Sequence, residues 1–157
     1  VAIAAGKGAT DTKPVAVATD GGFVASASRD VVAVTPAPCQ GATKRVPLVR
    51  LCYGRSGDKG NTVNIGLVAR QPEYLPFLRA TLTESAVGDY FAHAIDGESG
   101  RVTRYDLPGL SAMNFVMTSA LGGGGTSSIR VDALAKGFAQ QLLSMEVEAP
   151  AERFDGE

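Results

Sequence analysis

A heptapeptide at residues 55–61, R-S-G-D-K-G-N, concentrates charged, hydroxyl and amide side chains between two apolar segments. A turn between two strands needs only two to five residues, so this segment carries more polar chemistry than a turn requires. Its glycines, Gly57 and Gly60, allow backbone N–H groups to converge as a nest, and Lys59 adds a positive charge. These features predict a site for a phosphate, a carboxylate or an oxyanion.

A purely structural role is the alternative interpretation of the same heptapeptide. In that case it is a rigid turn with an internal Asp58–Lys59 or Arg55–Asp58 ion pair. Asn61 and Asn64 then serve as hydrogen-bonding residues of the turn. The sequence alone leaves both interpretations open.

Four consecutive glycines at residues 122–125 form the second unusual segment. A glycine run costs conformational entropy on folding, and it is useful where something must approach the backbone closely. The segment is short, with apolar residues before it and a strand-like pattern after it. We therefore expect a close approach to the backbone, either by a ligand or by the heptapeptide. A flexible linker is the alternative.

The spacing of these residues excludes three familiar motifs. A P-loop fails because Lys59 precedes Gly60 and no hydroxyl residue follows. The nucleophile elbow fails because Asp58 occupies the place of its last glycine, and the dinucleotide fingerprint fails at Ser127. The chain has one histidine, His93, whose place in a predicted helix gives no indication of a catalytic triad.

Charge and hydropathy exclude two classes of partner. The net charge is −1, and the sequence has no Lys/Arg-rich run and no aromatic ladder, so we expect no nucleic-acid binding. No stretch approaches the roughly 18 apolar residues of a membrane-spanning helix, so we expect no membrane partner.

Cys39 and Cys52 are the only cysteines, and their spacing is unlike that of metal ligands. With His93 as the only histidine we expect no metal site. Cys52 lies in an apolar run, where a buried, inert thiol is typical, and pairing with Cys39 is left open. Nothing else in the sequence indicates an oxidising compartment, which predicts a cytoplasmic protein.

The elements that position the two polar segments are predicted from residue 46 onward. Alternating apolar residues predict strands at 46–53, 62–70 and 101–107, with the heptapeptide as the turn between the first two. Apolar residues at helical spacing predict helices at 73–82 and 84–94.

The rest of the chain shows the same mixed pattern. Residues 108–121 receive no assignment, and a short strand is expected at 128–132. Asp132 is expected to cap a helix at 133–143, before a last strand at 145–148. Strands and helices mix without regular βαβ alternation, which predicts an α+β sheet with helices on one face rather than a doubly wound sheet.

Residues 1–45 differ in composition from the remainder of the chain. They are rich in Ala, Val, Thr, Gly and Pro, with a hairpin signal at Asp20-Gly21-Gly22. Such a segment buries little large apolar area, so we interpret it as an arm or linker that packs on something else. A disordered tail is the alternative.

Three separated motifs carry a family resemblance: R-S-G-D-K-G-N-T-x-N-I-G from residue 55, Y-x-L-P-G-L-x-A-x-N-F-V from residue 105, and A-L-G-G-G-G-T-x-S-x-R-x-D from residue 120. They resemble the AtuA-like ferredoxin-fold domain, which is the C-terminal domain or small subunit of the acyclic terpene utilisation AtuA family. The resemblance implies a ferredoxin-like fold over 46–148, after the arm at 1–45 and before a C-terminal tail at 149–157.

The resemblance also implies a partner protein and a metabolic role. It implies a large AtuA-family subunit or domain as partner, in a homo- or hetero-oligomer that takes part in the catabolism of terpenoid or branched acyl-CoA compounds. Coenzyme A then enters as part of the substrate, with no intrinsic cofactor.

Two hypotheses arise for the motif residues. In the first, they complete an acyl-CoA site for a hydratase- or lyase-type step, with Asp58 as the proton-transfer group and Lys59 holding negative charge. The second makes the domain a non-catalytic assembly module. The binding residues expected under the first hypothesis are Arg55, Ser56, Gly57, Gly60, Asn61, Asn64, Asn114, Gly122, Gly123, Gly124, Gly125 and Thr126.

Overall fold

The computed structural model describes residues 3–5, 9–11, 35–107 and 109–154. Contacts divide the chain into two units, Val1–Asp30 and Val31–Glu157. In the first unit, strand β1 (Ile3–Ala5) pairs antiparallel with β2 (Ala9–Asp11). The hairpin predicted around Asp20-Gly21-Gly22 lies outside the described residues.

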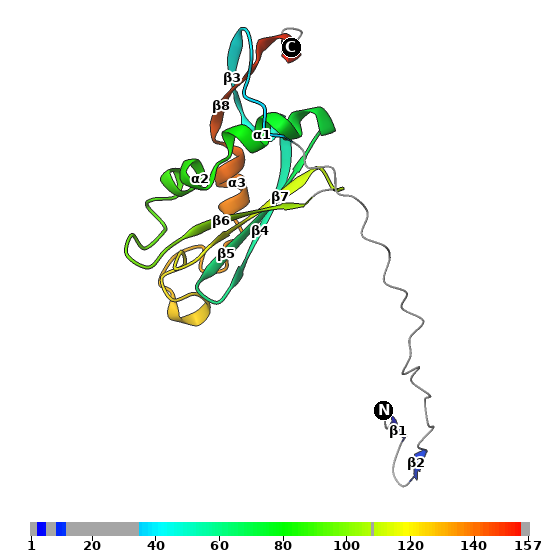
Figure 1. The fold of residues 1–157 in the computed structure, drawn as a ribbon. Coiled ribbons are helices and arrows are strands. Elements are labelled where there is room, and N and C mark those ends of the chain that lie inside the picture. The colour runs from blue at the N-terminus through cyan, green and yellow to red at the C-terminus, as the bar shows by residue number, and fades with distance from the viewer. Residues whose placement is uncertain (1–2, 6–8, 12–34, 108, 155–157) are drawn as a thin grey trace. The chain divides into compact units, whose positions relative to one another are not determined.

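The second unit is built on a four-stranded antiparallel sheet in the order β4-β5-β7-β6. Helices connect β5 to β6, and β7 lies between these two strands, so this part is a split β-α-β unit of the ferredoxin-like kind. Figure 1 shows the helices gathered on one side of this sheet. The predicted α+β class is confirmed. The strands are β4 (Cys52–Lys59), β5 (Thr62–Ala69), β6 (Val102–Leu107) and β7 (Ala112–Met117).

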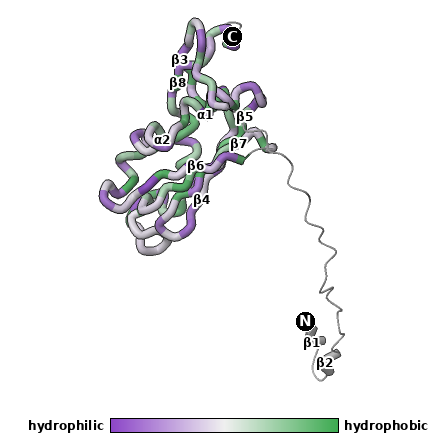
Figure 2. Tube along the Cα trace, in the orientation of Figure 1, coloured by the Kyte–Doolittle hydropathy of each residue, from purple (hydrophilic) through white to green (hydrophobic). Residues whose placement is uncertain are grey.

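Period-two alternation explains why the central strands form. Along β5, Val63, Ile65 and Leu67 are buried, whereas the intervening side chains face the other side of the sheet and are more exposed. On β7, Met113 and Phe115 continue the buried layer. Figure 2 shows hydrophilic residues at connecting loops and also along the edge strands β4 and β6. The buried side chains point to the face that the helices cover, and the opposite face of the sheet, the open face, is the more exposed one.

Three short helices cover the buried face of the sheet. Thr83 caps the second of them, because its hydroxyl oxygen accepts the Ala86 N–H at 3.1 Å. The rings of Phe91 and Phe138 stack 5.3 Å apart and join the end of the second helix to the third. The helices are α1 (Leu75–Thr81, entered through a 3-10 turn at Pro72–Tyr74), α2 (Glu84–Tyr90) and α3 (Phe138–Leu143).

The predicted strand at 46–53 was wrong. Strand β3 (Thr43–Pro47) instead pairs antiparallel with β8 (Glu146–Pro150), and a 3-10 turn at Leu48–Arg50 leads into β4. Leu48 and Leu51 are three residues apart and both are fully buried. A strand would point two such side chains to opposite faces, so the chain turns to bury both.

The helix predicted at 133–143 begins five residues later than expected, at Phe138. Asp132 does not cap it. Its carboxylate accepts the N–H groups of Lys136 at 2.7 Å and Gly137 at 2.8 Å, and Ala135 has a positive φ of 53°. Residues 132–137 therefore form a tight turn before the helix. The segment 128–132 is not a strand either.

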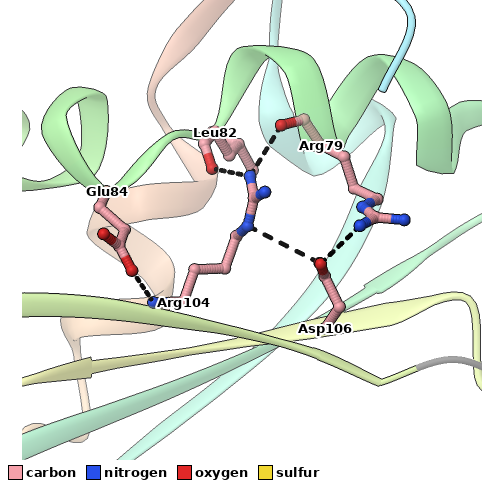
Figure 3. Close-up of polar contacts among 5 residues, drawn as sticks. All are labelled: Arg79, Leu82, Glu84, Arg104 and Asp106. Atoms are coloured by element: carbon pink, nitrogen blue, oxygen red, sulfur yellow. Dashed lines mark hydrogen bonds and ion pairs between the residues drawn. The ribbon is translucent and has the colours of Figure 1, made fainter. Parts of the chain in front are cut away.

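A cluster of charged side chains ties the β6 edge to the junction of α1 and α2 (Figure 3). The Arg104 guanidinium donates to the backbone carbonyl oxygens of Arg79 at 2.7 Å and Leu82 at 2.9 Å. The Arg104 backbone N–H donates to the Glu84 carboxylate at 2.8 Å. Asp106 pairs with Arg79 at 2.6 Å and lies 3.7 Å from Arg104. This cluster satisfies carbonyl groups at the end of α1 that have no partner within the helix.

Cys39 and Cys52 are both free. Burial raises the pKa of the Cys52 thiol to about 12, whereas an unperturbed cysteine titrates at about 8.5. The folded state therefore keeps this proton to higher pH than the unfolded state does. The resulting stabilisation is complete below pH of about 8.5 and is lost as the pH rises toward 12.

We expect the urea midpoint of the wild type to fall more steeply above pH of about 8.5 than that of Cys52→Ala, because only the wild type loses this linkage. Chemical denaturation across the alkaline range measures both slopes. The control is Cys39→Ala, whose thiol is less buried and which should keep most of the steep fall. Parallel curves for the wild type and Cys52→Ala would contradict the prediction.

Candidate functional site

The predicted polar turn is mostly strand. Strand β4 runs to Lys59, which pairs with Thr62, so only Gly60 and Asn61 form the turn. Gly60 has a positive φ of 61° at the first central position, which fits a type II′ hairpin turn. Gly57 lies in the ladder opposite Asn64. A nest spanning Gly57 and Gly60 is therefore not formed, and the polar side chains are instead presented by an extended strand.

This strand divides its side chains between the two faces of the sheet. The register places Ser56 opposite Ile65 and Asp58 opposite Val63, on the face that the helices cover. The alternate residues of the strand, Arg55, Gly57 and Lys59, belong to the open face. Because β4 is an edge strand, the two sets can meet around its free side.

A cavity of about 430 Å³ lies along this edge of the sheet. It brings together part of the sequence-predicted set and adds two residues, Gly66 and Lys136, that were not predicted. Its lining consists of Arg55, Ser56, Gly57, Asp58, Lys59, Asn64, Gly66 and Lys136.

Lys136 lies beside the predicted acid. Its ammonium nitrogen is 3.8 Å from the Asp58 carboxylate, whereas Lys59 donates to the Asp58 backbone carbonyl at 3.3 Å. The carboxylate of Asp58 therefore has an ion pair with Lys136 rather than with Arg55 or Lys59, the partners predicted for a rigid turn. Sequence reasoning missed Lys136 because it was assigned to a helix. Gly137, directly after it, was the available signal for a turn.

The backbone that carries Lys136 is held from two sides. Asp132 accepts two N–H groups of the turn, as described above, and Ala135 is fully buried in a left-handed conformation. From β4, the Ser56 hydroxyl accepts the Ala139 N–H at 2.9 Å and donates to the Lys136 carbonyl oxygen at 3.4 Å. Ser56 thus joins the edge strand to the turn, and these two hydrogen bonds give it a structural role.

The cavity carries a positive balance of charge. Its lining includes the cations Arg55, Lys59 and Lys136 and a single carboxylate, Asp58. The Asp58 side chain is 24% exposed and that of Lys136 is 64% exposed, so the acid is the more sheltered of the pair. Cationic donors beside the Asn64 amide suit an oxyanion such as a phosphate or a carboxylate.

The glycine run packs directly against the β4–β5 turn. A Cβ atom built on Gly124 would lie 1.9 Å from the Gly60 carbonyl oxygen. The Asn61 side-chain oxygen accepts the N–H groups of Leu121 at 3.0 Å and Gly123 at 2.9 Å, and the Asn61 carbonyl accepts the Ala120 N–H at 3.0 Å. The expected close approach is confirmed, and the partner is the first polar segment rather than a ligand.

Positive φ angles throughout residues 122–125, from 51° to 102°, explain why this run is glycine. Arg130 lies against the run. Its guanidinium donates to the carbonyl oxygen of Ala120, two residues before the first glycine, at 2.7 Å. The flexible-linker alternative does not fit these contacts. The run is a rigid support for the hairpin tip.

The remaining predicted binding residues lie elsewhere in the described part of the chain. Asn114 occupies β7 opposite Gly66, on the open face, and Thr126 lies exposed in a 3-10 turn at Gly125–Ser127. Neither belongs to the lining of the β4 cavity, nor does Asn61. His93 is exposed. Within the described residues, no three His, Cys, Asp or Glu side chains gather in a metal-binding group.

None of the helices in the described ranges is long and apolar enough to cross a membrane. In a comparison with known families, the family model described as the AtuA ferredoxin-like domain matches residues 46–148. Neither the curated proteins nor the solved structures contain a match to the chain.

Proposed function

Because the chain belongs to the family of the AtuA ferredoxin-like domain, we propose that it is the small subunit or domain of an AtuA-type complex. The complex acts on acyl-CoA in the catabolism of acyclic terpenoids and branched acyl chains. Its partner is a large AtuA-family part, and this chain contributes the β4 cavity to a shared site. The observation that carries the proposal is the gathering of the motif residues Arg55–Lys59 and Asn64 around one cavity with a positive balance of charge.

The chemistry of the cavity suits a step on a thioester. Arg55, Lys59 and Lys136 hold negative charge, either on the phosphates of coenzyme A or on the oxygen of the thioester carbonyl. Asp58 is the group that takes or gives a proton in a hydration, dehydration or lyase-type step. Coenzyme A enters as part of the substrate. The free thiols Cys39 and Cys52 support a cytoplasmic setting.

Asp58→Asn tests the proposal in the complex of this chain with its large AtuA-family partner. We expect turnover of acyl-CoA to fall by about 100-fold or more, because positioned acid–base groups contribute roughly 10²–10⁴-fold. Lys59→Ala should weaken substrate binding more than it lowers turnover. The control is Glu73→Gln, which neutralises an exposed carboxylate outside the cavity. Turnover within about twofold of the wild type for both cavity variants would remove the catalytic role.

A second candidate function is a non-catalytic assembly module that docks on the large subunit. The open face of the sheet favours it, because Tyr53, Val68, Tyr105 and Leu107 are between 38% and 56% exposed there. If this is the function, Val68→Ser weakens co-purification with the partner while Asp58→Asn leaves turnover unchanged. Light scattering after size-exclusion chromatography measures the assembly.

A further inference from the structure

We infer that Lys136 is the anion-binding group of the β4 cavity, and that an oxyanion binds at its ammonium group over Gly57. The inference adds a binding residue to the proposed function. It rests on that function only in naming acyl-CoA as the larger ligand. It assigns the principal positive charge to a residue outside the polar heptapeptide. Binding of the anion itself is a property of this chain and can be tested without a partner.

The first argument is the way in which Lys136 is held. A lysine on a free loop would lose much side-chain and backbone entropy on binding a ligand. Here the backbone N–H of Lys136 is fixed by Asp132 at 2.7 Å, and its carbonyl oxygen is contacted by Ser56. The left-handed Ala135, directly before it, is fully buried. The backbone position from which the lysine side chain extends is therefore fixed before any ligand binds.

The second argument is the place that its ammonium group occupies. A Cβ atom built on Gly57 would lie 3.3 Å from the Lys136 ammonium nitrogen. A Cβ atom at position 57 would thus push this nitrogen away from the strand by a few tenths of an ångström. The missing side chain leaves room for the charge next to the backbone of β4, inside the cavity that both residues line.

The third argument is that the charge remains available to a ligand. The ion pair between Lys136 and Asp58 is long, at 3.8 Å, and the lysine side chain is 64% exposed. Pairs of this kind contribute little to stability, so an oxyanion can compete for the ammonium group. Arg55 and Lys59 line the same cavity and raise its positive potential. Lys59 differs, because its ammonium donates to a backbone carbonyl oxygen of its own strand.

The test is a titration of the full chain with three probes: coenzyme A, inorganic phosphate and acetate. Amide chemical shifts of Ser56, Gly57 and Lys136 in ¹H–¹⁵N spectra report the binding. We expect saturable shifts, and we expect Lys136→Met to weaken binding by roughly tenfold to hundredfold, as for the loss of one charge-assisted hydrogen bond. Lys136→Arg should retain binding within a few-fold. Lys44→Met removes a remote ammonium group, which donates to the Phe154 carbonyl oxygen, and should change nothing.

A pair of glycine substitutions tests the position over Gly57. Gly57→Ala should weaken binding less than Lys136→Met does, because the added methyl group displaces the flexible ammonium group by only a few tenths of an ångström. The control is Gly97→Ala, which lies outside the cavity lining and where no atom lies within 4 Å of an added Cβ atom. It should bind the probes as the wild type does. Unchanged thermal midpoints confirm that the variants fold.

The probes also distinguish the sources of the oxyanion. Competition between phosphate and coenzyme A for the same shifts assigns the site to a phosphate group, whereas saturation by acetate alone assigns it to a carboxylate. Wild-type affinity in Lys136→Met, or no saturable shift with any probe, overturns the inference. Loss of binding in Lys59→Met but not in Lys136→Met overturns it too, and leaves the proposed function standing with another cation. The turnover of Asp58→Asn in the complex decides that function separately.

Discussion

Gly124→Ala is expected to lower the free energy of unfolding by about 3 kcal/mol or more. Gly124 has a φ of 72° and a ψ of 164°, a backbone region that is essentially restricted to glycine and costs other residues about 1–3 kcal/mol. The added methyl group would also overlap the Gly60 carbonyl oxygen, 1.9 Å away. To relieve this overlap, the hairpin turn must move and strain the hydrogen bonds of Asn61. Urea denaturation of the full chain measures the loss.

The neighbouring Gly125→Ala gives the cost of a positive φ without the overlap. Gly125 also has a positive φ, 51°, but no atom lies within 4 Å of a Cβ atom built there. Its substitution should cost only the conformational term of about 1–2 kcal/mol. Equal losses in the two variants would show that the contact between the glycine run and the hairpin tip adds nothing to stability.

The second large effect is expected for Arg104→Met, which should lower the free energy of unfolding by about 2–4 kcal/mol. The Arg104 side chain is only 19% exposed. Its loss leaves the Arg79 and Leu82 carbonyl oxygens without their donor and removes one cation from Asp106. Desolvated acceptors that lose a charged donor are costly, whereas the aliphatic part of methionine preserves much of the packing.

Arg45→Met is the matched control for this loss. Arg45 also pairs with two carboxylates, Glu146 at 3.5 Å and Glu148 at 3.7 Å, but its side chain is 67% exposed. Exposed pairs of this kind contribute about 0–1 kcal/mol. Denaturation curves of the two variants in one buffer measure the difference. A loss for Arg104→Met as small as that for Arg45→Met would mean that water satisfies the two carbonyl groups.

Part of the fold could be predicted from the sequence because single residues carried strong signals. The alternation of Val63, Ile65 and Leu67 predicted β5, and Thr83 predicted the start of α2. The family resemblance, based on three motifs, is confirmed by the match over residues 46–148. These signals are local, so they do not depend on which strands become neighbours.

The errors arose where tertiary contacts override local pattern. Residues 55–59 were assigned to a turn because they are polar. They form part of β4 instead, because an edge strand tolerates charged side chains that a central strand would not. The turn at Ala135 was hidden because alanine favours helices, and only packing and the two contacts of Asp132 hold it left-handed. Lys136 was missed for the same reason.

The free edge of β4 has a consequence for the behaviour of the protein at high concentration. An exposed edge strand is a template for pairing between copies, and charged residues, lysine above all, oppose such pairing. Arg55, Asp58 and Lys59 lie on this strand, and Lys136 lies beside it. We therefore expect the charges that line the cavity to oppose edge-to-edge pairing of the sheet as well. Variants that neutralise several of them at once should be less soluble as well as less able to bind an anion.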